Sequence, residues 1–165
     1  FYSSDGGVIT SSHNVPVVTK PFSEISSSDY LLFIPGGAGV LNLVKDTVFI
    51  DQLKCLSHSA EFILTVCTGS ILFSKTGLLN GKKATSNKRL FSWTSKESPE
   101  VNWVKKARWI KEGKFYTSSG ISAGIDMTLG FISDVLGYDI AKKQSMEIEY
   151  EWKEDSTWDP FSEIY

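Results

Sequence analysis

The stretch Phe62-Ile63-Leu64-Thr65-Val66-Cys67-Thr68-Gly69-Ser70-Ile71-Leu72 decides the fold of this chain. Its first half is a short, continuous apolar run, which is typical of a parallel strand covered on both faces. A turn of small residues follows at Cys67, and the residues after it predict a helix over 68–79. A strand that turns sharply into a helix projects the residue at the turn from the end of the sheet, as in the nucleophile elbow of hydrolases. The pattern therefore places Cys67 where a nucleophile is held in that arrangement.

Two physical effects act on a thiol at such a turn. The first turn of the following helix carries partial positive charge, which favours thiolate over thiol. Its free backbone N–H groups can hold a developing oxyanion, and Gly69 lets the turn run close to a neighbouring element. From the elbow alone, the alternative that Cys67 is a small buried hydrophobic residue stays open. Cys55 lies in a predicted helix without this setting, so we expect it to be structural.

The rest of the chain alternates strands with helices. A second buried strand is predicted at 30–34, and short edge strands at 8–10 and 15–18, where Pro16 argues against a central position. Other predicted features are a turn at 5–7, a polar connector at 26–29, helices over 47–58, 88–93, 125–136 and 139–151, and a hairpin of 104–110 with 114–117. This alternation predicts one α/β domain over 1–165, with a mostly parallel sheet sandwiched by helices.

Ligands of such sheets bind beyond the carboxyl ends of the strands, and a second strand end here is rich in glycine. The segment Pro35-Gly36-Gly37-Ala38-Gly39 can present bare N–H groups to an anion or a carbonyl oxygen. It lacks the features of a phosphate loop or a dinucleotide fingerprint, and alone it is more often only a turn. Beside the Cys67 elbow, Gly36 and Gly37 become candidates for a second wall of one pocket.

A third segment leads into the predicted buried helix. The loop Ser119-Gly120-Ile121 consists of small and apolar residues, and Gly120 and Ile121 can line the same pocket. Ser122 is predicted to be the N-cap of this helix. Asp126 is expected in its first turn, where a carboxylate interacts favourably with the helix dipole, so a structural role is the simpler interpretation.

Composition and charge exclude several classes of function. The chain has 165 residues, of which 41% are hydrophobic and 22% charged, and this suits one soluble globular domain. Its net charge of -2 gives no electrostatic basis for binding nucleic acid or an anionic membrane, and no apolar run approaches the roughly 20 residues that cross a bilayer. Two cysteines make no disulfide framework, so we expect a cytoplasmic, reducing location. His13 and His58 lack metal-ligand spacing, and we expect neither metal nor cofactor.

Taken in order, these segments resemble the ThiJ/PfpI superfamily, which includes the parkinsonism-associated deglycase type. The closest branch by resemblance is isocyanide hydratase-like, with a flavodoxin-like, class I glutamine amidotransferase-like fold. The matching segments are Pro35-Gly36-Gly37, Val66-Cys67-Thr68-Gly69-Ser70, Gly77 to Thr85, Ser119 to Asp126, Ile148-Glu149-Tyr150 and Asp159-Pro160-Phe161. The resemblance covers nearly the whole chain. It implies that Cys67 is the nucleophile, that the backbone N–H groups of Thr68 and Gly37 are oxyanion donors, and that the protein is a homodimer.

Two departures from the family pattern bear on mechanism. The family's acidic partner of the cysteine follows its first strand, and this chain resembles the family from the second strand onward. We therefore expect the first strand and helix to be missing, and about 40 residues to precede Phe1 in the native protein or to come from a separate fragment. Some relatives carry histidine where Asn87 stands, and an amide hydrogen-bonds but cannot shuttle protons. Asn87 and Asp126 remain candidates for indirect support of the site.

Two hypotheses for function follow. In the first, the protein is a cysteine-dependent enzyme acting on a small electrophilic carbon, either an isocyanide hydratase-like lyase or a glyoxalase- or deglycase-like hydrolase. In the second, it is a non-catalytic dimer that senses oxidation or binds a ligand, with Cys67 oxidising to a sulfinate held by the same N–H groups. The expected partner is a small molecule. A regulatory role on DNA is not expected, because no helix-turn-helix segment follows the domain.

Overall fold

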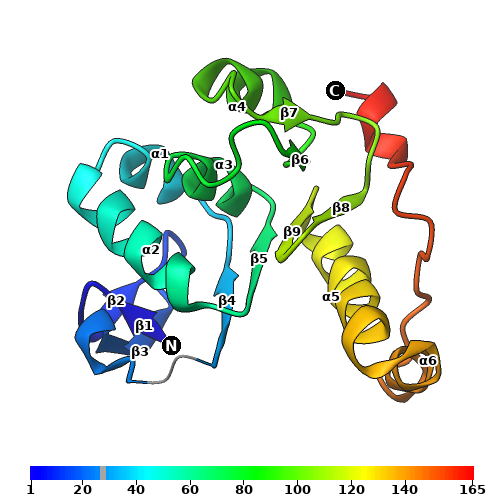
Figure 1. Ribbon diagram of the computed structural model, residues 1–165, viewed down its shortest axis with the longest axis horizontal. Coiled ribbons are helices and arrows are strands. Elements are labelled where there is room, and N and C mark those ends of the chain that lie inside the picture. The colour runs from blue at the N-terminus through cyan, green and yellow to red at the C-terminus, as the bar shows by residue number, and fades with distance from the viewer. Residues whose placement is uncertain (27–28) are drawn as a thin grey trace.

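The computed structural model describes residues 1–26 and 29–165, so Ser27 and Ser28 of the predicted polar connector lie outside the described residues. Its main sheet has the strand order β4 (Leu31–Ile34), β5 (Phe62–Val66), β9 (Phe115–Ser118) and β8 (Trp109–Glu112) (Figure 1). β4, β5 and β9 run parallel, and β8 pairs antiparallel with β9 as a hairpin. The predicted mostly parallel α/β sheet is confirmed, and the carboxyl ends of its three parallel strands meet at one edge.

Helices cover both faces of this sheet. One face carries α2 (Thr47–Ser59) and α3 (Gly69–Ser74), preceded by the single turn α1 (Val40–Leu43). The other face carries α5 (Ile121–Leu136), which packs on β5, β8 and β9 and forms a hairpin with α6 (Tyr138–Glu147). This two-sided cover explains why the strands are apolar runs rather than alternating ones.

The core follows from the alternation of side chains along β5. Ile63 belongs to the cluster on the α2 and α3 side, together with the buried ring of Phe73. Leu64 points to the opposite face and packs with Tyr116 and Met127 under α5. All five side chains are almost completely buried, so each contributes about 1.5–3 kcal/mol of hydrophobic stabilisation to the sheet.

Smaller elements surround this sandwich. A second sheet has the order β1 (Tyr2–Ser3), β3 (Pro16–Pro21) and β2 (Asp5–Thr10), followed by a 3₁₀ turn at Phe22–Glu24. A short pair joins β6 (Lys83–Ala84) to β7 (Asn102–Trp103), with α4 (Phe91–Glu97) between them, and a 3₁₀ turn at Pro160–Glu163 ends the tail.

Two expectations for the second sheet were wrong. Residues 5–7 do not form a free turn: Gly6 and Gly7 have φ of 71° and 83°, as turn glycines do, but pairing with β3 keeps them in β2. The strand that contains Pro16 is central in this small sheet. Pro16 is tolerated there because it is the first residue of β3, where the ladder ends.

Several boundaries also differ from the sequence prediction. α5 begins at Ile121 with Gly120 as its N-cap, so Ser122 does not cap it and Asp126 lies beyond its first turn. β8 begins at Trp109, the first residue that pairs with β9, and the N–H groups of Arg108 and Trp109 donate to the tail carbonyl of Ser156. Three helices also differ from their predicted bounds. α3 ends at Ser74 instead of residue 79, α4 spans Phe91–Glu97 instead of 88–93, and α6 ends at Glu147 instead of residue 151.

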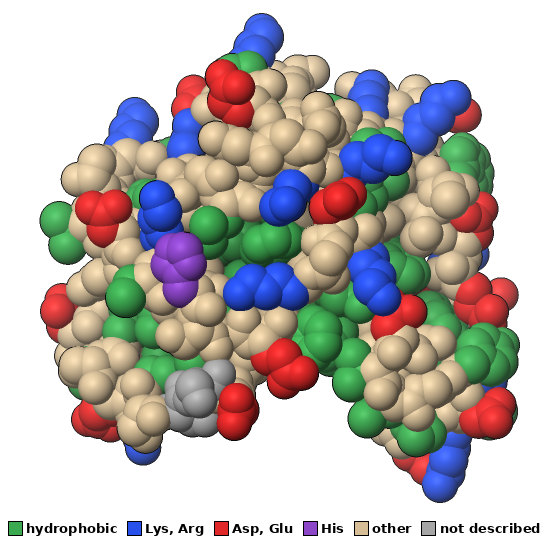
Figure 2. Space-filling view, in the orientation of Figure 1, with side chains coloured by type: hydrophobic (Ala, Val, Ile, Leu, Met, Phe, Trp, Pro, Cys, Tyr) green, Lys and Arg blue, Asp and Glu red, His purple; other side chains and the backbone are tan. Residues whose placement is uncertain are grey.

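One edge of the main sheet is uncovered. β4 is an edge strand among the described residues, and its Phe33 side chain is 50% exposed. In the space-filling view the molecule is notched between the β1–β3 sheet and the α5–α6 hairpin, with hydrophobic side chains around the notch (Figure 2). Within residues 1–26 and 29–165, no helix is long and apolar enough to cross a membrane.

Candidate functional site

The turn between β5 and α3 holds Cys67 in a left-handed backbone conformation, with φ of 59°. This conformation costs a non-glycine residue roughly 1–2 kcal/mol. Hydrogen bonds fix it: the Cys67 N–H donates to the Ser118 carbonyl at 3.2 Å, and the Ser70 and Ser86 hydroxyls donate to the Cys67 carbonyl at 3.0 and 3.1 Å. The sharp turn expected from the sequence is thus a strained elbow, of the kind that displays a nucleophile.

Cys67 lines a cavity of ≈ 560 Å³ at the carboxyl edge of the sheet. The loop after β4 contributes Gly36 and Gly37, and α5 contributes Ile121. The other lining residues are mainly apolar: Phe33, Pro35, Val66, Gly124, Ile125 and Thr128. Three segments far apart in sequence therefore meet around the thiol. Thr68 and Gly120 were also expected to line the pocket, and both lie next to lining residues without lining it themselves.

The glycine loop after β4 packs directly on the elbow. A Cβ on Gly36 would lie 2.8 Å from the backbone nitrogen and the hydroxyl of Thr68, so only glycine fits there without movement. The Gly37 N–H donates to Thr68 Oγ1 at 2.9 Å, so this proposed oxyanion donor already has a partner. The Thr68 N–H makes no hydrogen bond within the described part of the chain, which leaves it open to a ligand.

Asn87 is the polar side chain that contacts the cysteine sulfur. Its Nδ2 donates to Cys67 Sγ at 3.2 Å, while its Oδ1 accepts a hydrogen bond from the Leu90 N–H at 3.2 Å. The second bond fixes the orientation of the amide, so that its NH₂ group faces the sulfur. An N–H donor stabilises negative charge on sulfur but cannot remove a proton from it. The sequence singled out Asn87 only as a candidate for indirect support, whereas the contact is direct.

Asp126 lies elsewhere, in a buried charge cluster that we define as Lys88, Arg108, Asp126 and Asp159. Its carboxylate is fully buried and accepts hydrogen bonds from Arg108 Nε at 2.7 Å and from the Lys153 N–H at 2.8 Å. Arg108 Nη2 lies 2.6 Å from the same carboxylate, and Nη1 lies 3.8 Å from Asp159. This carboxylate is occupied by arginine and makes no hydrogen bond to Cys67. Sequence reasoning missed Arg108, which no motif or periodicity marks.

Lys88 connects this cluster to the segment that carries Asn87. Its side chain is buried, and Nζ donates to Thr85 Oγ1 and to the Ala107 carbonyl, both at 2.7 Å. Burial lowers the pKa of Lys88 to about 8, and the negative charge of Asp159 offsets part of this effect. The lysine thereby anchors the turn that presents Ser86 and Asn87 to the elbow.

Among the described residues, Cys67 has neither an acidic partner nor a cluster of metal-ligating side chains. No carboxylate within residues 1–26 and 29–165 hydrogen-bonds to its sulfur, and no group of three or more His, Cys, Asp or Glu side chains in that part could hold an ion. The site as described consists of a strained cysteine, amide donors and an apolar cavity. That arrangement suits covalent addition of sulfur to an electrophile.

Known proteins resemble the chain both in sequence and in structure. It is 33% identical to the isonitrile hydratase of Pseudomonas putida over 122 residues, 73% of this chain and 51% of that protein. It is 27% identical to the HTH-type transcriptional regulator CdhR of Pseudomonas aeruginosa over 143 residues, 87% of this chain and 42% of the regulator. A crystal structure of a ThiJ/PfpI family protein from Pseudomonas syringae superposes with a TM-score of 0.76 at 25% identity, covering 91% of this chain and 62% of the other.

These relatives place the chain in a family without fixing what the whole protein does. The chain spans about half the length, or less, of the curated relatives it matches. One of those relatives is a hydratase and the other a regulator, so one domain type occurs in both settings. The sequence pattern of the DJ-1/PfpI family matches residues 2–134, which include both the glycine loop and the cysteine elbow. The chain therefore belongs to the DJ-1/PfpI family.

Proposed function

We propose that this chain carries the nucleophile of a cysteine-dependent enzyme that acts on a small electrophilic carbon, with hydration of an isonitrile as the leading reaction. The observation that carries the proposal is the geometry at Cys67: a left-handed elbow whose sulfur accepts from Asn87 and opens on an apolar cavity. The 33% identity to an isonitrile hydratase supports the same reaction class. Glyoxalase- or deglycase-like chemistry on an aldehyde carbon is the next version.

For an isonitrile, R–N≡C, the proposed steps balance with water as the only co-reactant. The sulfur of Cys67 bonds to the terminal carbon while that carbon takes up a proton, giving a thioimidate, R–N=CH–S. Water then adds to the same carbon, one of its protons passes to the nitrogen, and the free N–H of Thr68 holds the oxygen as the second proton leaves it and passes to the departing sulfur. The C–S bond breaks, sulfur leaves with its electron pair, and the product is the formamide R–NH–CHO.

These steps need a group that carries protons, and Asn87 cannot serve because an amide does not titrate near neutral pH. We propose that a carboxylic acid from outside the residues of this chain fills this role. The edge strand β4 and the exposed Phe33 beside the cavity suit an added strand and helix, since an edge strand presents N–H and C=O groups that another strand can pair with. A homodimer in the reducing cytoplasm, where Cys67 and Cys55 stay free, completes the proposal.

Replacing the cysteine tests the enzyme hypothesis. Cys67→Ser is expected to lower the hydration of cyclohexyl isocyanide at least about 100-fold, because serine is a much weaker nucleophile without a base beside it. Cys55→Ser is the matched control and should retain the wild-type rate, since Cys55 is an exposed residue of α2. Formamide production is followed by chromatography. Equal rates in wild type and Cys67→Ser would reject the nucleophile role.

The second candidate is a ligand-binding or oxidation-sensing domain without turnover. It is favoured by the alignment of 87% of this chain with a transcriptional regulator and by the fact that no carboxylate within residues 1–26 and 29–165 hydrogen-bonds to the Cys67 sulfur. In this case neither cyclohexyl isocyanide nor methylglyoxal is consumed by the wild type. Low concentrations of hydrogen peroxide would instead add two oxygen atoms to Cys67, measurable as a mass gain that Cys67→Ser lacks. Turnover without such oxidation would decide against it.

A further inference from the structure

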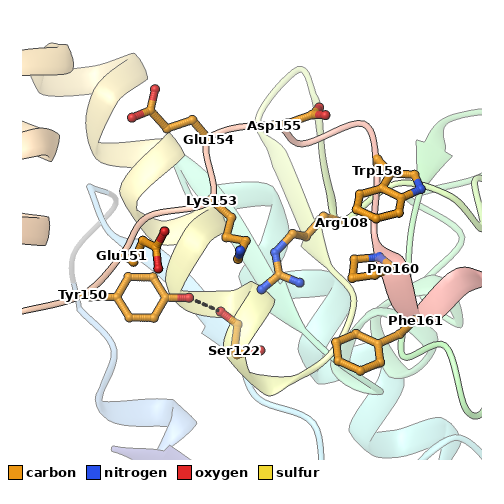
Figure 3. A pocket seen from close by; sticks show the side chains of 10 residues that line it. All are labelled: Arg108, Ser122, Tyr150, Glu151, Lys153, Glu154, Asp155, Trp158, Pro160 and Phe161. Carbon is orange, nitrogen blue, oxygen red and sulfur yellow. Dashed lines mark hydrogen bonds between the residues drawn. The ribbon is translucent and has the colours of Figure 1, made fainter.

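A second cavity, of ≈ 670 Å³, lies between the start of α5 and the C-terminal tail (Figure 3). Arg108 and Ser122 line it from the body of the domain, and the tail lines it with residues between Tyr150 and Phe161. We call it the tail pocket. Cys67 does not line it, although Ser122 directly follows Ile121 of the Cys67 cavity. The tail pocket is therefore a separate site, and neither hypothesis for Cys67 assigns it a role.

Two positive side chains of the tail pocket lack a full set of partners. Lys153 is exposed, and its Nζ makes no hydrogen bond or ion pair within the described residues. Arg108 uses Nε and Nη2 on Asp126, its Nη1 forms a long ion pair of 3.8 Å with Asp159, and its guanidinium lies within reach of the Tyr150 hydroxyl; Nη1 makes no hydrogen bond within the described residues. In Figure 3 both side chains end in the middle of the ring of lining residues. Donors that converge on open space are suited to an anionic group.

Two acidic residues at the rim do not compete for these donors. The Glu154 carboxylate is held by Lys142 at 3.0 Å and by the Tyr138 hydroxyl at 3.2 Å. Asp155 accepts hydrogen bonds from the backbone and the side chain of Thr157. The third rim acid, Glu151, makes no ion pair within the described part, and its negative charge limits how much anionic charge the pocket accepts.

The remaining walls of the tail pocket are aromatic. Trp158 and Phe161 are about half exposed although they flank a cavity, and in Figure 3 they stand with Pro160 on the side of the pocket opposite Tyr150. The Tyr150 hydroxyl donates to the Ser122 carbonyl at 3.4 Å and also lies within reach of the Asp126 and Arg108 side chains. Flat apolar surfaces on two sides favour a planar ligand that stacks between them.

We propose that the tail pocket binds a small aromatic carboxylate. The carboxylate lies between Arg108 Nη1 and Lys153 Nζ, and the ring packs against Trp158 and Phe161. Because Asp126 already compensates Arg108, Lys153 is the lining cation without a carboxylate partner among the described residues, and it matches a single negative charge better than a phosphate dianion; the largely apolar lining favours a ligand with few polar atoms. The domain then binds a small-molecule ligand at a site separate from Cys67.

Calorimetric titration with 2-naphthoate tests the proposal, with neutral 2-naphthamide and inorganic phosphate as comparison probes. The wild type is expected to bind naphthoate about tenfold more tightly than naphthamide, because only naphthoate meets the two cations. Lys153→Gln should weaken naphthoate binding about 3- to 10-fold and leave naphthamide unchanged. Trp158→Ala should weaken the binding of both naphthoate and naphthamide. Lys153 and Trp158 are exposed, so these variants are expected to fold, which circular dichroism checks.

Controls separate this proposal from the function of Cys67. Lys143→Gln removes another exposed lysine, which pairs with Glu147 outside the pocket, and this variant should bind naphthoate as the wild type does. Cys67→Ser should also bind naphthoate normally, whether or not the protein is an enzyme. Equal affinity for naphthoate and naphthamide, no binding of naphthoate, or an unchanged Lys153→Gln variant would each overturn the proposal. Tighter binding of phosphate than of naphthoate would overturn the assignment to a carboxylate.

Discussion

The elbow at Cys67 and the buried charge cluster around Asp126 satisfy their polar atoms in different ways. Asp126 is fully buried and matched to Arg108, and it accepts further hydrogen bonding from the tail backbone. The sulfur of Cys67 has one neutral donor, Asn87, and faces a cavity from a strained backbone. In the first region the charged groups pair with one another and stabilise the fold. In the second region the Cys67 sulfur remains available to a ligand in the cavity. Substitutions in the two regions should therefore change different measured quantities.

The largest effect on stability is expected in the charge cluster. Asp126→Asn removes the charge that compensates Arg108 in a buried site, which should lower the free energy of unfolding by about 3–5 kcal/mol. Urea denaturation measures it. Glu147→Gln is the control: Glu147 pairs with Lys143 at an exposed site, so its loss should cost about 1 kcal/mol or less. Equal losses in the two variants would contradict the distinction drawn between buried and surface charge.

Steric crowding at the elbow should produce the second-largest loss of stability. Gly36→Ala places a Cβ 2.8 Å from the backbone of Thr68, and the required movement should cost about 1–3 kcal/mol in unfolding free energy. Gly39→Ala lies in the same loop, with nothing within 4 Å and φ of -59°, so it should be neutral or stabilising by up to about 1 kcal/mol. Urea denaturation of both variants checks the difference. If both variants lose the same stability, the close packing of loop and elbow is refuted.

The charge cluster should also make stability depend on pH through Lys88. Its pKa is about 8 in the folded protein and 10.5 as its ordinary value, so between these values the unfolded chain binds more protons. Stability should therefore rise with pH, by about 2 kcal/mol from pH 7 to pH 9.5. In Lys88→Met this rise should disappear from the urea profile. The raised pKa values of Tyr30, Tyr116 and Tyr150 keep those groups protonated over this range. A rise of equal size in Lys88→Met would refute the assignment to Lys88.

The smallest effect comes from the strained backbone itself. At Cys67, glycine should be more stable than alanine by about 1 kcal/mol, because only glycine accepts φ of 59° without cost. At Cys55, inside α2, the order should reverse by about the same amount, since glycine destabilises helix interiors. Comparing the four variants by urea denaturation gives both differences. The same sign at both positions would mean that the elbow carries no backbone strain.

How much of this could be predicted from sequence depends on how local each feature is. The elbow was predictable because its strand, turn and helix are adjacent in the chain. The position of the glycine loop beside it was predictable because the carboxyl ends of parallel strands lie at one edge of the sheet. The pair Arg108 and Asp126 was not predictable, since the partners come from different elements and neither belongs to a charge pattern. The contact of Asn87 with sulfur was missed for a similar reason: it requires the segment after β6 to fold back over the elbow.

The central claim, that Cys67 is the reactive atom of this domain, is tested most directly by limited alkylation. The protein is treated at neutral pH with less iodoacetamide than thiol, and the modified cysteines are quantified by peptide mass spectrometry. Exposure alone favours Cys55, because it is exposed whereas Cys67 is partly buried. We predict that Cys67 is alkylated first, owing to the Asn87 amide that donates to its sulfur and to its position at a helix start. Preferential alkylation of Cys55 would contradict the account.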